Sequence, residues 1–113
     1  MKSLKRSWGK LTDKILTLLG FASKSGNLSF GMDSFKDKAR SKKSRLAVAA
    51  SDISEKSLKE VKFYCNKYNI KLLILESDIL TLSHAVGKKC GIVSVNDRNF
   101  AESIIALGGN AND

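Results

Sequence analysis

The sequence predicts an α/β domain, a three-layer α/β/α sandwich in which helices cover both faces of a small mixed β-sheet. Two kinds of apolar pattern alternate through most of the chain: residues at helical spacing, and short unbroken runs. The chain has 113 residues, of which 42% are hydrophobic, and this fits one compact domain rather than two. We therefore expect a single domain at residues 10–108, with a basic tail at residues 1–9 and a short tail at residues 109–113.

The helices are predicted from apolar residues three or four positions apart. Leu11, Ile15, Leu18 and Ala22 predict the first helix, which should break near Gly26. The later helices have inward-facing sets at Met32, Phe35 and Ala39, at Leu58, Val61, Cys65 and Tyr68, and at Ile79, Leu82 and Val86, followed by a last helix over residues 97–107.

The strands are predicted from apolar runs that do not alternate with polar residues. Residues 46–50, 72–75 and 92–95 have this pattern, which is typical of strands that helices cover on both faces. Residues 28–30 are a shorter candidate. Helix starts are predicted at Ser54, Ser77 and Asn96, each of which precedes an acidic residue, and Gly108 and Gly109 are expected to end the last helix.

The charge of the chain points to a polyanionic partner. Twenty Lys and Arg residues against eleven Asp and Glu residues give a net charge of +9 and a pI near 9.7. Nucleic acid and an anionic membrane surface both fit this charge. No apolar run reaches about 18 residues and no charged start leads into an apolar segment, so we expect no membrane association and a cytoplasmic protein.

A glycine turn followed by a basic helix is the clearest local signal. Gly31 allows close approach of the backbone to a ligand, and the helix that begins after it offers amide groups that lack helical partners. The positive residues that follow are Lys36, Lys38, Arg40, Lys42, Lys43 and Arg45. This combination is common in proteins that bind RNA, and the alternative is a solvated amphipathic surface.

The sequence offers little for catalysis or metal binding. His84 is the single histidine, and Cys65 and Cys90 lack the spacing of a metal site, so we expect no metal and no cofactor. Cys65 is interpreted as a small apolar core residue. A nucleophile would need a base and a third orienting group, and no phosphate-binding loop of the Walker type occurs. We therefore expect a protein that is not an enzyme.

Three segments together resemble a known family. They are residues 19–31 (LGFASKSGNLSFG), the strand that ends at residues 49–52 (AASD), and residues 82–88 (LSHAVGK). Their order and spacing resemble the kink-turn-binding ribosomal protein superfamily, which includes the large-subunit ribosomal proteins seven-Ae and thirty-e, and most of all its small stand-alone bacterial members. The resemblance covers residues 11 to 107 and implies a fold like that of ribosomal protein thirty-e.

The resemblance also implies a site. Family members bind a kink-turn, a sharply bent RNA with tandem sheared G·A pairs, through a Gly-x-Asn-Glu motif at the start of the second helix. Gly31 matches the motif glycine, while Asp33 and Ser34 stand where strong binders have Asn and Glu. Ionised Asp accepts hydrogen bonds and cannot donate them, and Ser34 is too short to accept from a guanine edge as Glu does. These two positions bear on kink-turn selectivity rather than on general RNA binding.

The family's second contact is a loop after the fourth helix, which meets an extruded nucleotide. Here that loop is Gly87-Lys88-Lys89-Cys90-Gly91. Its glycines would allow close approach, its lysines would meet phosphates, and Cys90 would offer an apolar contact to a base. The alternative is an ordinary turn between helix and strand with solvated lysines.

We therefore expect non-catalytic binding of structured RNA, a kink-turn or related bent RNA that is ribosomal or ribosome-associated, by a monomer. The alternative is a protein-interaction adaptor in the translation or transcription machinery. Trp8 could stack on a base or pack on the core. The residues expected to face RNA are Gly31, Met32, Asp33, Ser34, Lys36, Lys38, Lys42, Lys43, Gly87, Lys88, Lys89, Cys90 and Gly91.

Overall fold

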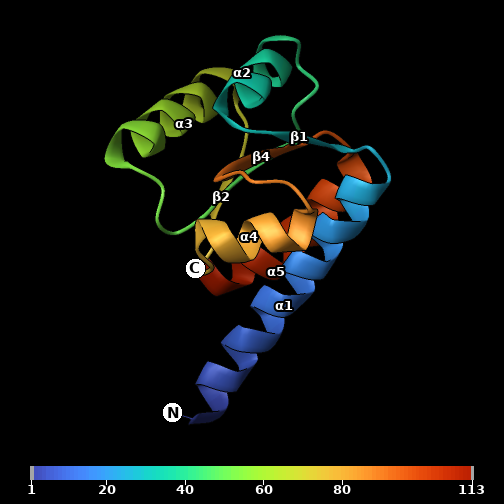
Figure 1. Ribbon diagram of the computed structural model, residues 1–113, viewed down its shortest axis with the longest axis vertical. Helices are drawn as coiled ribbons and strands as arrows, with labels where there is room; N and C mark the ends of the chain where they lie inside the picture. Colours follow the sequence, from blue (N-terminus) through green and yellow to red (C-terminus); the bar gives the residue numbers. More distant parts are fainter. Residues whose placement is uncertain (1, 113) are drawn as a thin grey trace.

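Five helices and four strands alternate through residues 2–112 (Figure 1). A computed structural model describes the backbone at residues 2–112 and the side chains at residues 13–108. The side chains of Trp8 and of the two predicted tails lie outside this described part, and the division into a domain and tails stays a prediction. In chain order the elements are α1 (Lys2–Lys24), β1 (Leu28–Phe30), α2 (Met32–Arg40), β2 (Leu46–Ala49), α3 (Glu55–Tyr68), β3 (Leu72–Ile74), α4 (Ile79–Val86), β4 (Ile92–Val95) and α5 (Arg98–Asn112).

The strands form one mixed sheet in the order β1-β4-β2-β3. β4 runs antiparallel to both β1 and β2, whereas β2 and β3 are parallel. Every residue of the central strands β2 and β4 is buried, as their unbroken apolar runs predicted. β3 is an edge strand, and the side chain of Ile74 is 39% exposed, so the predicted cover on both faces is incomplete there.

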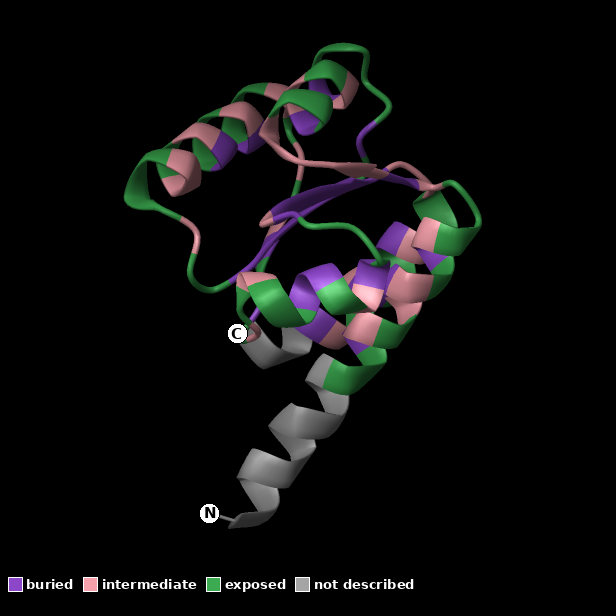
Figure 2. Cartoon of the chain, in the orientation of Figure 1, coloured by how far each residue is buried: buried purple, intermediate pink, exposed green. Residues whose placement is uncertain are grey.

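Helices cover both faces of this sheet, which confirms the predicted three-layer sandwich (Figures 1 and 2). We call α1, α4 and α5 the three-helix layer, and α2 and α3 the two-helix layer. Residues of β2 alternate between the layers: Leu46 and Val48 pack against the three-helix layer, while Ala47 and Ala49 pack against the two-helix layer. Within residues 2–112, none of the helices combines the length and apolar character needed to cross a membrane.

Two of the predicted helix starts show how local side chains decide a boundary. Ser54 caps α3 as predicted, because its hydroxyl accepts a hydrogen bond from the amide of Ser57 (3.1 Å). The prediction for α4 was wrong by one residue. Asp78, not Ser77, is its cap, and the Asp78 carboxylate accepts from the amide of Thr81 (2.8 Å).

The predicted cap of α5 was also wrong by one residue. The carboxylate of Asp97 accepts from the amide of Phe100 (2.9 Å). The side chain of Asn96 is used elsewhere, because its amide donates to the hydroxyl of Ser29 (2.9 Å) and its oxygen accepts from that of Ser94 (2.7 Å). Asn96 therefore links β1 to β4 instead of starting the helix.

Gly108 does not end α5, contrary to the prediction, since the helix extends to Asn112. Gly108 is buried, and a Cβ atom at this position would lie 2.7 Å from Cδ1 of Leu73. The glycine therefore allows α5 to pack closely against β3. The absence of a side chain at Gly108 permits this close contact, and the residue does not stop the helix.

Candidate nucleic-acid interface

Gly31 forms the turn between β1 and α2. Its φ of 88° and ψ of 167° lie in a region that side chains make unfavourable, so the turn depends on glycine. Its amide donates to the carbonyl of Ile92 (2.8 Å), which fixes the start of α2 to β4. A Cβ atom here would meet nothing within 4 Å, so this backbone is open to an approaching ligand.

The first turn of α2 is exposed and lacks a capping side chain. Gly31 supplies no such side chain, and the first helical hydrogen bond of the turn runs from the amide of Phe35 to the carbonyl of Gly31 (3.0 Å). Amide groups at such a helix start attract anions. Asp33 and Ser34 are both exposed in this turn, and the negative charge of Asp33 opposes a phosphate there.

The loop between α4 and β4 lies beside this turn. Gly87 ends α4 with a φ of 79°, and its amide donates to the carbonyl of Ser83 (2.9 Å). The chain then brings the ammonium of Lys88 to 5.3 Å from the ring centroid of Phe30, the residue before Gly31. Two segments almost sixty residues apart in the sequence therefore form one surface.

Cys90 points away from that surface. Its side chain is buried in the core of the three-helix layer, and burial raises the pKa of its thiol while nearby Lys88 lowers it. Its backbone is held by Ser83, whose hydroxyl accepts from the Cys90 amide (3.0 Å) and contacts the Cys90 carbonyl (3.2 Å). In this arrangement Cys90 anchors the loop and offers no thiol to a base.

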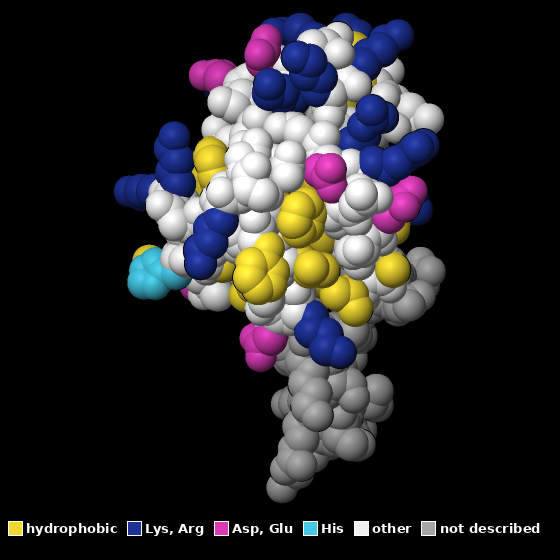
Figure 3. Space-filling view, turned by 90° about the vertical axis from the view of Figure 1, so that its right-hand side faces the viewer, with side chains coloured by type: hydrophobic (Ala, Val, Ile, Leu, Met, Phe, Trp, Pro, Cys, Tyr) yellow, Lys and Arg dark blue, Asp and Glu magenta, His cyan; other side chains and the backbone are white. Residues whose placement is uncertain are grey.

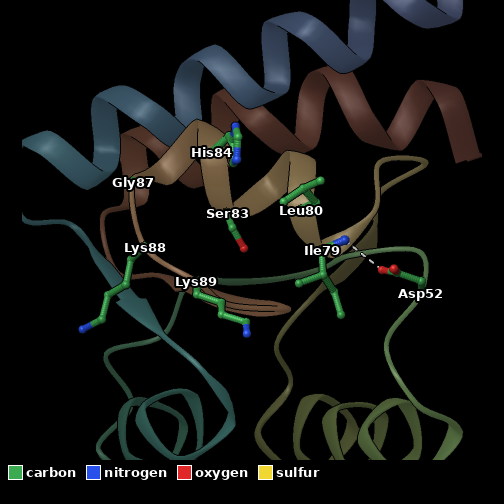
Figure 4. A pocket seen from close by; sticks show the side chains of 8 residues that line it. All are labelled: Asp52, Ile79, Leu80, Ser83, His84, Gly87, Lys88 and Lys89. Carbon is green, nitrogen blue, oxygen red and sulfur yellow. Dashed lines mark hydrogen bonds between the residues drawn. The ribbon is translucent and has the colours of Figure 1, made fainter.

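A hollow of about 710 Å³ lies next to the loop (Figure 4). Ile79 and Leu80 give it apolar walls, and Lys88 and Lys89 stand at its edge. Across from them lies Asp52, whose carboxylate accepts from the amide of Ile79 (2.8 Å). The other lining residues are Ser83, His84 and Gly87. Sequence reasoning missed Asp52, Leu80 and His84, because no local pattern reveals that the loop after β2 lies beside α4.

The predicted basic residues of α2 separate in space. The ammonium of Lys36 donates to the carboxylate of Glu60 and lies 5.4 Å from the ring centroid of Tyr64, so Lys36 faces α3. This contact raises the pKa of Lys36 and lowers the pKa of Glu60. Lys42 and Lys43 are exposed beyond the other end of α2 from Gly31.

Lys38 is half-buried in the last turns of α2. Figure 3 shows Lys and Arg side chains over the upper part of the molecule, where the two-helix layer lies, and a group of apolar side chains lower down. The structure thus unites the glycine turn and the loop at residues 87–91, and distributes the basic residues of α2 along and beyond the helix.

The described residues give no support to metal chemistry. Among residues 13–108, no three Asp, Glu, His or Cys side chains are grouped as metal ligands. Cys65 is buried between α3 and the sheet, and burial raises its pKa to about 11, which keeps the thiol protonated near neutral pH. It is a core residue, as the sequence predicted.

Comparisons with known proteins agree with this geometry. The chain is 30% identical over 91 residues to the RNA-binding protein YlxQ of Bacillus subtilis (strain 168), which covers 80% of this chain and 90% of that protein. A solved structure of a protein of unknown function from Bacillus halodurans superposes with a TM-score of 0.81 at 25% identity, covering 85% of this chain and 97% of that one. The 15.5kD RNA binding protein of Giardia lamblia superposes with a TM-score of 0.74 at 13% identity, covering 91% and 88% of the two chains.

A family model also matches most of the chain. Residues 13–105 match the model described as the Ribosomal protein L7Ae/L30e/S12e/Gadd45 family. This range includes the glycine turn, the whole sheet and the loop between α4 and β4. The resemblance read from the sequence is therefore confirmed, and the chain belongs to the Ribosomal protein L7Ae/L30e/S12e/Gadd45 family.

Proposed function

We propose that this protein binds structured RNA, without catalysis, through the first turn of α2 and the loop at residues 87–91. We call this the glycine-turn surface. One observation carries the proposal: Lys88 lies over the ring of Phe30, directly beside the open backbone of Gly31. The family and the RNA-binding names of two similar proteins support it.

The chemistry of the surface suits a bent phosphate backbone. The amides at the start of α2 point at an incoming anion, and Lys88 and Lys89 add positive charge from the loop. The hollow beside the loop offers the apolar walls of Ile79 and Leu80 to an unstacked base. A kink-turn or related bent RNA, ribosomal or ribosome-associated, presents both features together.

The experiment compares a kink-turn RNA with a plain duplex of equal length by fluorescence anisotropy at several salt concentrations. We expect the kink-turn to bind more tightly. The plot of log K against log salt has a negative slope. Lys88→Gln should make this slope shallower by about 0.7–0.9, as the loss of one phosphate contact does. Lys36→Gln should change the slope less, because Glu60 already pairs with that ammonium.

Lys14→Gln is the matched control. Lys14 is exposed on α1, so this substitution removes the same charge at a place outside the glycine-turn surface. An equal loss from Lys14→Gln and Lys88→Gln would contradict the proposed surface and indicate attraction by net charge alone. Failure of both RNAs to bind would contradict the proposed function and favour the protein adaptor.

A further inference from the structure

An exposed aromatic side chain on α3 has no structural role in the core. Phe63 is 60% exposed, and its ring contacts the edge of the Tyr64 ring at 5.7 Å between centroids. The ammonium of Lys67, one turn later, lies 5.9 Å from the Phe63 centroid. A large ring held in solvent with a cation beside it is a feature of surfaces that bind nucleic-acid bases.

The same pattern of rings and cations continues around the helix. The rings of Tyr64 and Tyr68 stack at 6.0 Å with an angle of 29° between their planes. Lys67 lies 5.4 Å from the Tyr68 ring, and the guanidinium of Arg40 lies 5.7 Å from the Tyr64 ring. Arg40 also donates to the Tyr64 hydroxyl (3.1 Å), so α2 and α3 share one outer surface.

A second hollow continues this surface at the ends of α2 and α3. Its volume is about 370 Å³, and Tyr68 forms part of its wall. Lys42, Arg45 and Lys67 supply positive charge, and no carboxylate is among its lining residues. A cation in the last turn of a helix interacts favourably with the negative end of the helix dipole, and this accounts for Lys67. It does not account for Arg45, which lies outside both helices next to β2.

We propose that this aromatic–basic face, formed by Phe63, Lys67, Tyr68, Arg40 and the hollow, binds a single-stranded segment of RNA. Bases would stack on the ring of Phe63 and on the edge of the tyrosine pair, and phosphates would lie along the cations. Lys42 and Lys67 favour RNA over a protein partner at this face, because the centres of protein interfaces are depleted of lysine although they are rich in aromatic residues and arginine.

This face is separate from the glycine-turn surface. Gly31 precedes α2, whereas Lys42 and Arg45 follow it, and a nine-residue helix is roughly 13 Å long. The inference does not depend on kink-turn binding. One RNA with a structured part and a single-stranded extension could nevertheless reach both surfaces along the length of α2, which lies beside α3 over the sheet (Figure 1).

The test uses a fluorescent single-stranded oligouridine of about 12 nucleotides, a length within the range that a single OB-fold domain covers. We expect Phe63→Ala to weaken binding at least about fivefold, as the loss of one stacked base does. The matched control is Phe21→Ala, because Phe21 is 55% exposed on α1, and it should change affinity little. Phe63 is mostly exposed, so its variant should keep the fold, which circular dichroism checks.

A charge variant separates the two surfaces. Lys67→Gln should weaken oligouridine binding and make its salt dependence shallower by about 0.7 in log K per log salt, while Lys88→Gln should weaken oligouridine binding less than Lys67→Gln and kink-turn binding more. The inference is overturned if the wild type does not bind oligouridine, if Phe21→Ala weakens binding as much as Phe63→Ala, or if Lys88→Gln has the larger effect. Oligouridine binding through Phe63 without any kink-turn binding would overturn the proposed function alone.

Discussion

The two helical layers differ in how they are held to the same sheet. Among residues 13–108, the core of the three-helix layer contains sixteen buried residues, most of them Leu, Ile and Val. The core of the two-helix layer contains seven, of which three are alanines at Ala39, Ala47 and Ala49 grouped with the single large ring of Phe35. The two-helix layer adds polar contacts between its helices at the outer edge, such as Lys36 with Glu60 and Arg40 with Tyr64.

This difference teaches how a small basic domain can combine stability with binding. The three-helix layer buries most of the apolar surface, and apolar burial is the main stabilising term in folding. The two-helix layer holds little of the core, so its helices can expose lysines, arginines and aromatic rings on their outer faces. Both proposed RNA-binding surfaces include α2, which belongs to this layer.

The largest expected effect is a truncation in the three-helix layer. Leu82 is fully buried, and Leu82→Ala should lower the free energy of unfolding by about 2–5 kcal/mol, because it leaves a cavity in the main core. Urea denaturation measures this loss, and hydrogen exchange shows its extent. We expect amides of both layers to lose protection together.

The matched variant is Val61→Ala, at a fully buried position of the two-helix layer. It should raise exchange mainly in α2 and α3, since the small core around Val61 is what holds these two helices to their face of the sheet. If exchange rises equally in all helices, the two layers unfold as one unit and the contrast between them is wrong.

The sequence predicted the layers well because the spacing of apolar residues along an element indicates which of its faces are buried. The unbroken runs in β2 and β4 and the spacing of Leu82 and Val86 required only local information. The contact of Gly108 with Leu73 could not be predicted from the sequence, because it depends on where α5 crosses β3.

The candidate site was predictable only in part, for the same reason. Gly31 stood out because its turn requires glycine, and this requirement is local. That Lys88 reaches Phe30 depends on the pairing of β1 with β4, and that Lys36 turns to Glu60 depends on the packing of α2 against α3. No pattern of residues in the sequence contains either pairing.

A smaller effect is expected at the glycine turn, where stability and binding can be separated. Gly31→Ala should lower the free energy of unfolding by about 1–3 kcal/mol, because alanine is strained at a φ of 88°. It should also weaken RNA binding, since its methyl group enters the open space at the backbone of α2.

Gly26→Ala is the control for this variant. Gly26 also has a positive φ, 78°, and open space around a Cβ atom, but it lies in the turn before β1. We expect it to lose stability and keep its affinity for RNA. Equal losses of affinity in the two variants, measured by anisotropy well below their melting temperatures, would show that Gly31 has no special place in binding.

The smallest expected effect uses the pH dependence of a buried thiol in each layer. Burial raises the pKa of Cys65 to about 11, from 9.0 for a free thiol. Between these values the unfolded chain releases a proton that the folded chain keeps, so stability falls as pH rises, by about 1 kcal/mol at pH 10. Cys65→Ala should remove this part of the decline in the free energy of unfolding, as urea denaturation measures it between about pH 8 and pH 10.

Cys90→Ala in the three-helix layer should remove less of the decline, because Lys88 opposes the rise in the pKa of Cys90. The same decline in wild type and Cys65→Ala would mean that the Cys65 thiol ionises in the folded protein, and that the two-helix layer admits water to its core.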